Sequence, residues 1–86
     1  MFYMYILKSK KNGSLYFGST NNLKRRLEEH NQGLSTYTNM HRPYELVYYE
    51  AYKSENDARK REDNLKLRAN AWNQLKLRIV DSIKTN

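Results

Sequence analysis

Five side chains of this sequence could together perform proton-transfer and phosphate chemistry: Tyr5, Tyr16, Arg26, His30 and Glu62. A guanidinium binds phosphate oxygens through paired, charge-assisted hydrogen bonds, and tyrosine and histidine can transfer protons. A carboxylate is a hard oxygen ligand that suits Mg²⁺. Arg26, His30 and Glu62 fall on helix faces that should bury apolar side chains, which packing alone does not explain. We therefore expect a polar site.

The two tyrosines lie on predicted strands over residues 2–7 and 15–18, which flank an Asn12-Gly13 turn typical of a β-hairpin. If the loop has an even number of residues, Tyr5 and Tyr16 project from the same face of the pair. A strict two-residue loop would separate Tyr5 from the residue opposite Tyr16 by roughly 13 Å along the strand. A longer loop would bring the tyrosines together, and the sequence leaves the register open.

Asn21 or Asn22 can cap a helix over residues 23–30 that ends before Gly33. One side of this predicted helix carries two apolar and two polar residues, namely Leu23, Arg26, Leu27 and His30. Arg26 is thus expected to be covered, whereas the neighbouring Arg25 points to solvent. For Arg26 and His30, the alternatives are a snorkelling arginine and a satisfied core histidine.

The second half of the chain reads as one strand and two helices. Residues 45–52 are an apolar strand that we expect to be central or well covered. Ser54 to Asp57 resembles a capping box and begins a charged helix in which Glu62 is the only acid on the buried stripe. The other members of that stripe are Ala58, Leu65 and Ala69. Alternatively, Glu62 pairs with Arg59, Arg61 or Lys66 on a solvated helix.

The last helix is predicted to begin near Asn70 and to have a purely structural role. Its apolar face carries Trp72, Leu75, Ile79 and Ile83. A polar loop over residues 34–42 lies between the first predicted helix and the third predicted strand. We expect this loop to determine the choice of substrate. The chain is thus predicted to be one domain, residues 1–86, of the α/β class in its α+β form. Its expected element order is ββαβαα, a small antiparallel sheet flanked by helices.

The amino-acid composition limits the classes of partner and metal that we expect. Sixteen Lys and Arg against nine Asp and Glu give a net charge of +7, which favours a nucleic acid. No apolar run has the length of a membrane span or signal peptide, so we expect a cytoplasmic protein with no membrane partner. Without cysteine, and with two histidines, a zinc site is not expected and any metal would bind oxygen.

In its ordered motifs, the sequence resembles the GIY-YIG nuclease superfamily from residue 2 to about residue 72. The motifs are Tyr3-Met4-Tyr5, Tyr16-Phe17-Gly18, Arg26 eight residues after Gly18, His30 four residues further on, and a late Glu62. The segments Asn31-Gln32-Gly33, Arg42-Pro43 and 46–52 are similar to those of the small stand-alone bacterial members. Two positions depart from the pattern, since Tyr3 replaces a glycine and Phe17 an isoleucine.

The resemblance implies a three-stranded antiparallel sheet and a site with one divalent metal, Mg²⁺ or Mn²⁺, held by Glu62. Arg26 would bind the phosphate, and Tyr5 would deprotonate the attacking water, provided that nearby cations or the metal lower its pKa. Tyr16 would orient the water or the phosphate, and His30 would relay a proton or donate a hydrogen bond. Each residue taken alone could equally be an ordinary packed side chain.

The sequence therefore predicts a metal-dependent endonuclease that hydrolyses phosphodiester bonds in DNA, with RNA as an alternative substrate. A small domain without an obvious second module favours a structured target, such as a branch or flap. We expect a monomer. One alternative is a non-catalytic, basic nucleic-acid-binding module of the same fold. Another is a small structural protein that docks to an acidic partner.

Overall fold

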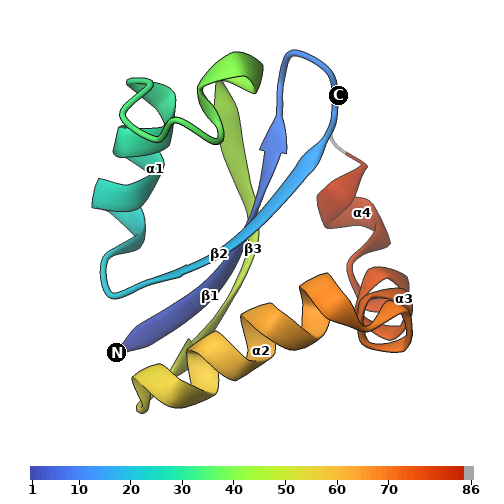
Figure 1. The fold of residues 1–86 in the computed structure, drawn as a ribbon. Helices are drawn as coiled ribbons and strands as arrows, with labels where there is room; N and C mark the ends of the chain where they lie inside the picture. Colours follow the sequence, from blue (N-terminus) through green and yellow to red (C-terminus); the bar gives the residue numbers. More distant parts are fainter. Residues whose placement is uncertain (85–86) are drawn as a thin grey trace.

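In the computed structural model, which describes residues 1–84, three strands form a sheet and helices pack on both of its faces (Figure 1). The elements are β1 Phe2–Ser9, β2 Leu15–Thr20, α1 Leu23–Asn31, the short 3₁₀ helix η1 Asn39–His41, β3 Tyr44–Tyr52, α2 Glu55–Leu67, α3 Ala69–Arg78 and α4 Val80–Ile83. The predicted α+β class and the order ββαβαα are confirmed, with η1 and α4 as short additions.

The sheet is antiparallel throughout and has the strand order β2-β1-β3. The central strand is β1, whose residues Met4 to Leu7 are all buried because helices cover both faces of the sheet. The expectation that the third strand is central was wrong, because β3 is an edge strand. Tyr49 and Ala51 of β3 are exposed. Leu46 and Val47 pack against apolar clusters on opposite faces of the sheet, so β3 is covered in part and not throughout.

The β1–β2 register brings the two site tyrosines onto one face. Tyr5 pairs with Gly18 and Leu7 pairs with Tyr16. The strands close over a loop longer than two residues, in which the Ser9 amide donates to the Ser14 carbonyl at 2.8 Å and Gly13 has a φ of +78°. A positive φ favours glycine, which explains the Asn12-Gly13 pair. The longer-loop alternative is therefore the one observed.

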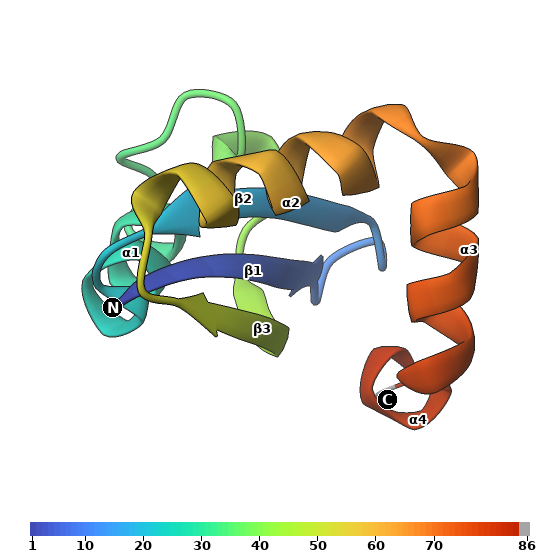
Figure 2. The same cartoon turned by 90° about the horizontal axis from the view of Figure 1, so that it is seen from below.

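Two apolar clusters hold the helices to opposite faces of the sheet (Figure 2). On one face, Leu23 and Leu27 of α1 pack against a cluster of Tyr5, Leu7 and Tyr44. On the other face, α2 and α3 contribute to a larger cluster made of Met4, Ile6, Leu65, Leu75 and Ile79. The alternation of side chains along β1 thus separates the α1 face from the α2 face.

Helix ends follow the sequence closely in some places and depart from it in others. Asn22 caps α1, because its side chain accepts a hydrogen bond from the Arg25 amide at 3.0 Å. Ser54 precedes α2 as predicted, but its side chain makes no capping hydrogen bond. The last helix begins near Asn70 as predicted, since α3 begins at Ala69. The expectation for Ala69 was wrong, because it is exposed and lies beyond the end of α2.

Candidate functional site

Tyr5 lies at the centre of the candidate site because its partner across the sheet is a glycine. The Tyr5 ring covers Gly18 so closely that a Cβ atom built there would lie 2.5 Å from the Tyr5 Cζ atom. Gly18 has no positive φ, so the glycine is required by space and not by backbone conformation. The glycine that ends the Tyr16-Phe17-Gly18 triplet therefore makes room for a buried tyrosine.

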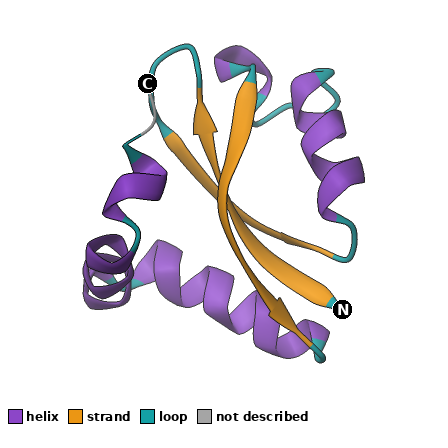
Figure 3. Ribbon diagram, turned by 180° about the vertical axis from the view of Figure 1, so that it is seen from behind, coloured by secondary structure: helices purple, strands orange, loops and turns teal. Residues whose placement is uncertain are grey.

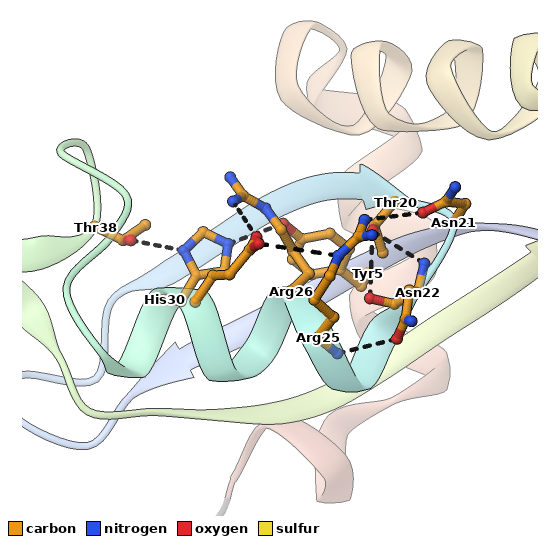
Figure 4. Close-up of polar contacts among 9 residues, drawn as sticks. Tyr5, Thr20, Asn21, Asn22, Arg25, Arg26, His30 and Thr38 are labelled. Atoms are coloured by element: carbon orange, nitrogen blue, oxygen red, sulfur yellow. Dashed lines mark hydrogen bonds and ion pairs between the residues drawn. The ribbon is translucent and has the colours of Figure 1, made fainter.

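A chain of hydrogen bonds runs from Tyr5 through His30 to Thr38 (Figure 4). The Tyr5 hydroxyl lies 2.9 Å from His30 Nε2, and His30 Nδ1 lies 2.6 Å from Thr38 Oγ1. All three side chains are buried. His30 therefore lies on the covered side of α1, and the loop after α1 contributes Thr38 to the site. The sequence placed Thr38 in a polar loop without marking it as a site residue.

Burial sets the protonation of this chain. It raises the pKa of Tyr5 to about 12, although the nearby Arg26 guanidinium favours the ionised form. It also lowers the pKa of His30 to about 4, with a further contribution from the positive charge of Arg26. At neutral pH Tyr5 is consequently protonated and His30 is neutral, so that one imidazole nitrogen accepts a hydrogen bond and the other donates.

Arg26 is held beside Tyr5 by the turn of α1 before His30 (Figure 4). Its Nη1 atom donates to Glu29 Oε1 at 3.0 Å. The Arg26 side chain is 31% exposed and that of Arg25 is 57% exposed, so the predicted contrast between the two arginines is present. Arg26 can therefore reach a ligand from beside the buried Tyr5 and His30.

Tyr16 forms the open edge of the site. Its ring centroid lies 4.9 Å from that of His30, 6.3 Å from that of Tyr5 and 5.8 Å from that of Tyr37. Within residues 1–84, no hydrogen-bond partner is present for the Tyr16 hydroxyl. That hydroxyl is thus available to a ligand.

Glu62 lies on α2, which packs on the face of the sheet opposite to α1. Its side chain is only 16% exposed and accepts a hydrogen bond from Lys66, one helical turn further along α2. The negative charge of Glu62 also raises the pKa of Tyr5, by less than burial and with less influence than Arg26 or Tyr16. The Lys66 ammonium lies 6.0 Å from the centroid of the Tyr16 ring. The structure combines the two predicted alternatives, since Glu62 is covered and yet ion-paired.

A second polar cluster, which the sequence did not indicate, joins β3 to α2. Glu50 accepts a bidentate pair from Arg61, with Nε at 3.0 Å and Nη2 at 3.2 Å. The hydroxyls of Tyr48, at 2.7 Å, and of Tyr52 also donate to this carboxylate. Burial alone would raise the pKa of Glu50, but the hydrogen bonds from Tyr52, Arg61 and Tyr48 outweigh it and lower the pKa.

Four elements thus assemble two tyrosines, a histidine, an arginine and a carboxylate around the edge strand of a small α+β sheet. Residues 1–76 match the sequence profile of the GIY-YIG catalytic domain. The chain belongs to the GIY-YIG family, whose fold is that of nucleases and whose nucleases generally use divalent metal ions and act on DNA. The predicted family is therefore confirmed.

The relatives place the chain among small bacterial proteins of the UPF0213 group. A UPF0213 protein of Clostridium perfringens is 45% identical over 67 residues, which cover 77% of this chain and 71% of the relative. A UPF0213 protein of Staphylococcus aureus is 39% identical over 79 residues, or 91% of this chain and 92% of the relative. The solution NMR structure of a UPF0213 protein from Bacillus halodurans has a TM-score of 0.56 at 30% identity, covering 98% of this chain and 95% of that one. Within residues 1–84, the helices are too short or too polar to cross a membrane.

Proposed function

We propose that this protein is a metal-dependent endonuclease that hydrolyses phosphodiester bonds in DNA, and that Tyr5, Tyr16, Arg26, His30 and Glu62 carry the reaction. The observation that best supports the proposal is the grouping of Arg26, Tyr16 and Glu62 around Tyr5, each close enough to affect the pKa of Tyr5. These groups match the needs of phosphate binding, water orientation and charge relief.

The donor set around Glu62 suits a magnesium ion better than a transition metal. Among residues 1–84, no cluster of three or more His, Cys, Asp or Glu could hold a metal, and Glu62 is the protein ligand that we propose. Mg²⁺ often binds through one or two carboxylates, keeping water and substrate phosphate in its remaining positions. When bound by Glu62, Mg²⁺ or Mn²⁺ would polarise the phosphate and neutralise charge on the leaving oxygen.

Arg26 would bind the scissile phosphate. Its Nη1 atom is held by Glu29, so the guanidinium is oriented while most of its remaining N–H groups stay available. Arg26 also lowers the pKa of His30, after the larger effect of burial. A phosphate bound to Arg26 would offset part of that positive charge, and His30 would then become a better proton acceptor.

Tyr5 would accept the proton of the attacking water while passing its own proton to His30. With a pKa of about 12, Tyr5 is a poor source of free tyrosinate at neutral pH, so a role as base calls for a proton acceptor. His30 Nε2 lies 2.9 Å from the Tyr5 hydroxyl and can be that acceptor when His30 Nδ1 donates to Thr38. The unbonded hydroxyl of Tyr16 would then orient the water or the phosphate.

The proposal is tested by incubating the protein with linear, nicked, flapped and branched DNA, in Mg²⁺, in Mn²⁺ and in chelator. We expect metal-dependent cleavage that falls by at least about 100-fold in Glu62→Ala and in Arg26→Ala. Each variant has a matched control on the same helix, namely Asp63→Ala and Arg25→Ala, which change exposed residues and should retain activity. Salt-sensitive DNA binding without cleavage under any metal would instead identify a non-catalytic binding module.

A further inference from the structure

A cavity of about 520 Å³ opens beside the candidate site, at the outer edge of β2. Its walls come from three parts of the chain, namely β2, the loop after α1 and helix α2. The residues that line it are Leu15, Tyr16, Phe17, Tyr37 and Lys66. Tyr16 and Lys66 also belong to the candidate site, so a ligand in the cavity would lie next to the phosphate that Arg26 is proposed to bind.

The loop side of the cavity is formed by an aromatic ring held out in solvent. The segment that joins α1 to β3 is largely loop (Figure 3). Tyr37 lies in this segment and is 82% exposed. Its ring is tilted by 51° against that of Tyr16, at a centroid distance of 5.8 Å. Leu34 and Met40 of the same loop are also largely exposed. Exposed apolar surface beside a polar site is a mark of a binding surface.

The ligand that fits these walls is flat, apolar on its faces and attached to an anion. Proteins bind single-stranded nucleic acids by stacking bases on aromatic side chains along a positively charged groove. Tyr16 and Tyr37 supply aromatic faces here, and Lys66 supplies a cation on the opposite wall. The net charge of +7 agrees with a polyanionic ligand.

We propose that this cavity binds an unpaired nucleobase adjacent to the scissile phosphate, with the base against Tyr37 and Tyr16. The proposal rests on the proposed function for the identity of the substrate as DNA, and it specifies which DNA. A base inside a duplex is covered by its neighbours on both faces, so it cannot stack on Tyr37. The protein therefore selects single strands, flaps and gaps over continuous duplex.

The test measures binding without cleavage. Fluorescence anisotropy in chelator compares a labelled oligothymidine with an abasic strand of the same length and charge. The parent protein should bind the strand with bases about tenfold more tightly. Tyr37→Ala should remove that difference, and Tyr37→Phe should preserve it, because stacking needs the ring and not the hydroxyl.

Tyr49→Ala is the matched control, because Tyr49 is a half-exposed tyrosine on the far edge strand β3. It should keep the full preference for bases. Circular dichroism checks that the variants remain folded. Equal affinity of the parent protein for both strands, a preference that survives Tyr37→Ala, or absence of binding to either strand would overturn the proposal.

The two proposals fail in different ways. A protein that cleaves DNA in Mg²⁺ but binds abasic and normal strands equally would keep the proposed nuclease function and lose the base site. A protein that binds bases through Tyr37 in chelator but cleaves nothing in any metal would keep the base site and lose the nuclease function.

Discussion

Two polar clusters of similar composition lie on the two faces of one sheet, and their hydrogen bonds differ. The cluster of Glu50, Arg61, Tyr48 and Tyr52 is closed, because the carboxylate accepts from all three partners and the guanidinium binds it in bidentate fashion. We call it the β3–α2 cluster.

The cluster around Tyr5 on the α1 face retains open hydrogen-bonding capacity. Arg26 is bound to Glu29 through one terminal nitrogen, and the Tyr16 hydroxyl has no partner within residues 1–84. Within residues 1–84, every buried side-chain nitrogen or oxygen atom has a hydrogen-bond partner, so this open capacity belongs to partly exposed groups that a ligand can reach. The same residue types stabilise the fold when all their hydrogen bonds are made within the protein. They are available for chemistry when some of those hydrogen bonds are not made.

The largest expected effect comes from closing the space under Tyr5. Gly18→Ala places a Cβ atom 2.5 Å from the Tyr5 Cζ atom, so the ring must move away from His30. We expect cleavage to fall by about 100-fold, because small displacements of reacting groups are costly. The free energy of unfolding should fall by only about 1 to 3 kcal/mol. Cleavage kinetics and urea unfolding measure the two effects.

The control for Gly18→Ala is Ser19→Ala, which changes the next residue on the opposite face of β2 and should leave cleavage near that of the parent. If Tyr5 is the group displaced, adding Tyr5→Phe to Gly18→Ala should cause little further loss. Full activity of Gly18→Ala would show that the position of Tyr5 is not important for the reaction.

The β3–α2 cluster should respond in stability. Glu50→Gln removes the charge that pairs with Arg61, and both side chains are mostly buried. We expect a loss of about 2 kcal/mol in the free energy of unfolding, below the range for fully buried pairs because some solvent reaches this one. Urea unfolding should show a loss below about 1 kcal/mol for Glu29→Gln, which weakens the more exposed ion pairs of Glu29 with Arg25 and Arg26. Equal losses would remove the distinction between the clusters.

Local sequence patterns were sufficient to predict the elements and the helix face that Arg26 and His30 share. The Asn12-Gly13 turn, the Asn22 cap and the 3.6-residue spacing of Arg26 and His30 depend on neighbours in the chain, so they were readable. Strand order was not readable, because β1 and β3 are similarly apolar and only tertiary pairing decides which is central.

The polar partners were the least predictable part of the molecule. Thr38 reaches His30 only through the path of an irregular loop, and no periodicity marks such a contact. Glu50 looked like an ordinary acid on a strand, since its meeting with Arg61 depends on how α2 crosses β3. Side-chain pairing between distant elements follows from packing, which a single sequence does not specify.

The two clusters should also differ in their response to acid. His30 has a pKa of about 4 in the folded protein and near 6.5 when unfolded, so the unfolded state binds more protons between these values. Stability therefore falls as pH decreases through this window, by about 2 kcal/mol between pH 7 and pH 5. Glu50, whose pKa is lowered, stays ionised at both pH values and adds no such change.

The pH prediction is checked by urea unfolding at pH 7 and pH 5 for the parent and for His30→Gln, which cannot titrate. The parent should lose about 2 kcal/mol more than the variant. NMR titration of the imidazole provides a direct measurement, and a midpoint near 6.5 would contradict the burial argument.

The smallest expected effect concerns Lys66, which pairs with Glu62 through a single contact, in contrast to the bidentate Arg61–Glu50 pair. Burial opposes the charge on Lys66, but its hydrogen bond to Glu62 and the negative charges around it together outweigh burial and raise the pKa, so the ammonium stays charged at neutral pH. A metal that binds Glu62 must displace this cation. Lys66→Ala should therefore strengthen Mn²⁺ binding about threefold to tenfold, in line with the modest strength of single exposed ion pairs.

Electron paramagnetic resonance of Mn²⁺, titrated without DNA, measures this affinity independently of cleavage. Lys60→Ala removes the same charge from an exposed position on the same helix, so it isolates the general electrostatic effect. Glu62→Gln should abolish the binding. An affinity that is unchanged or weaker in Lys66→Ala, relative to Lys60→Ala, would mean that Lys66 does not compete for Glu62. A stronger affinity would mark Glu62 as a carboxylate whose protein partner can leave, in contrast to Glu50, whose bidentate arginine and two tyrosines leave no position for a metal.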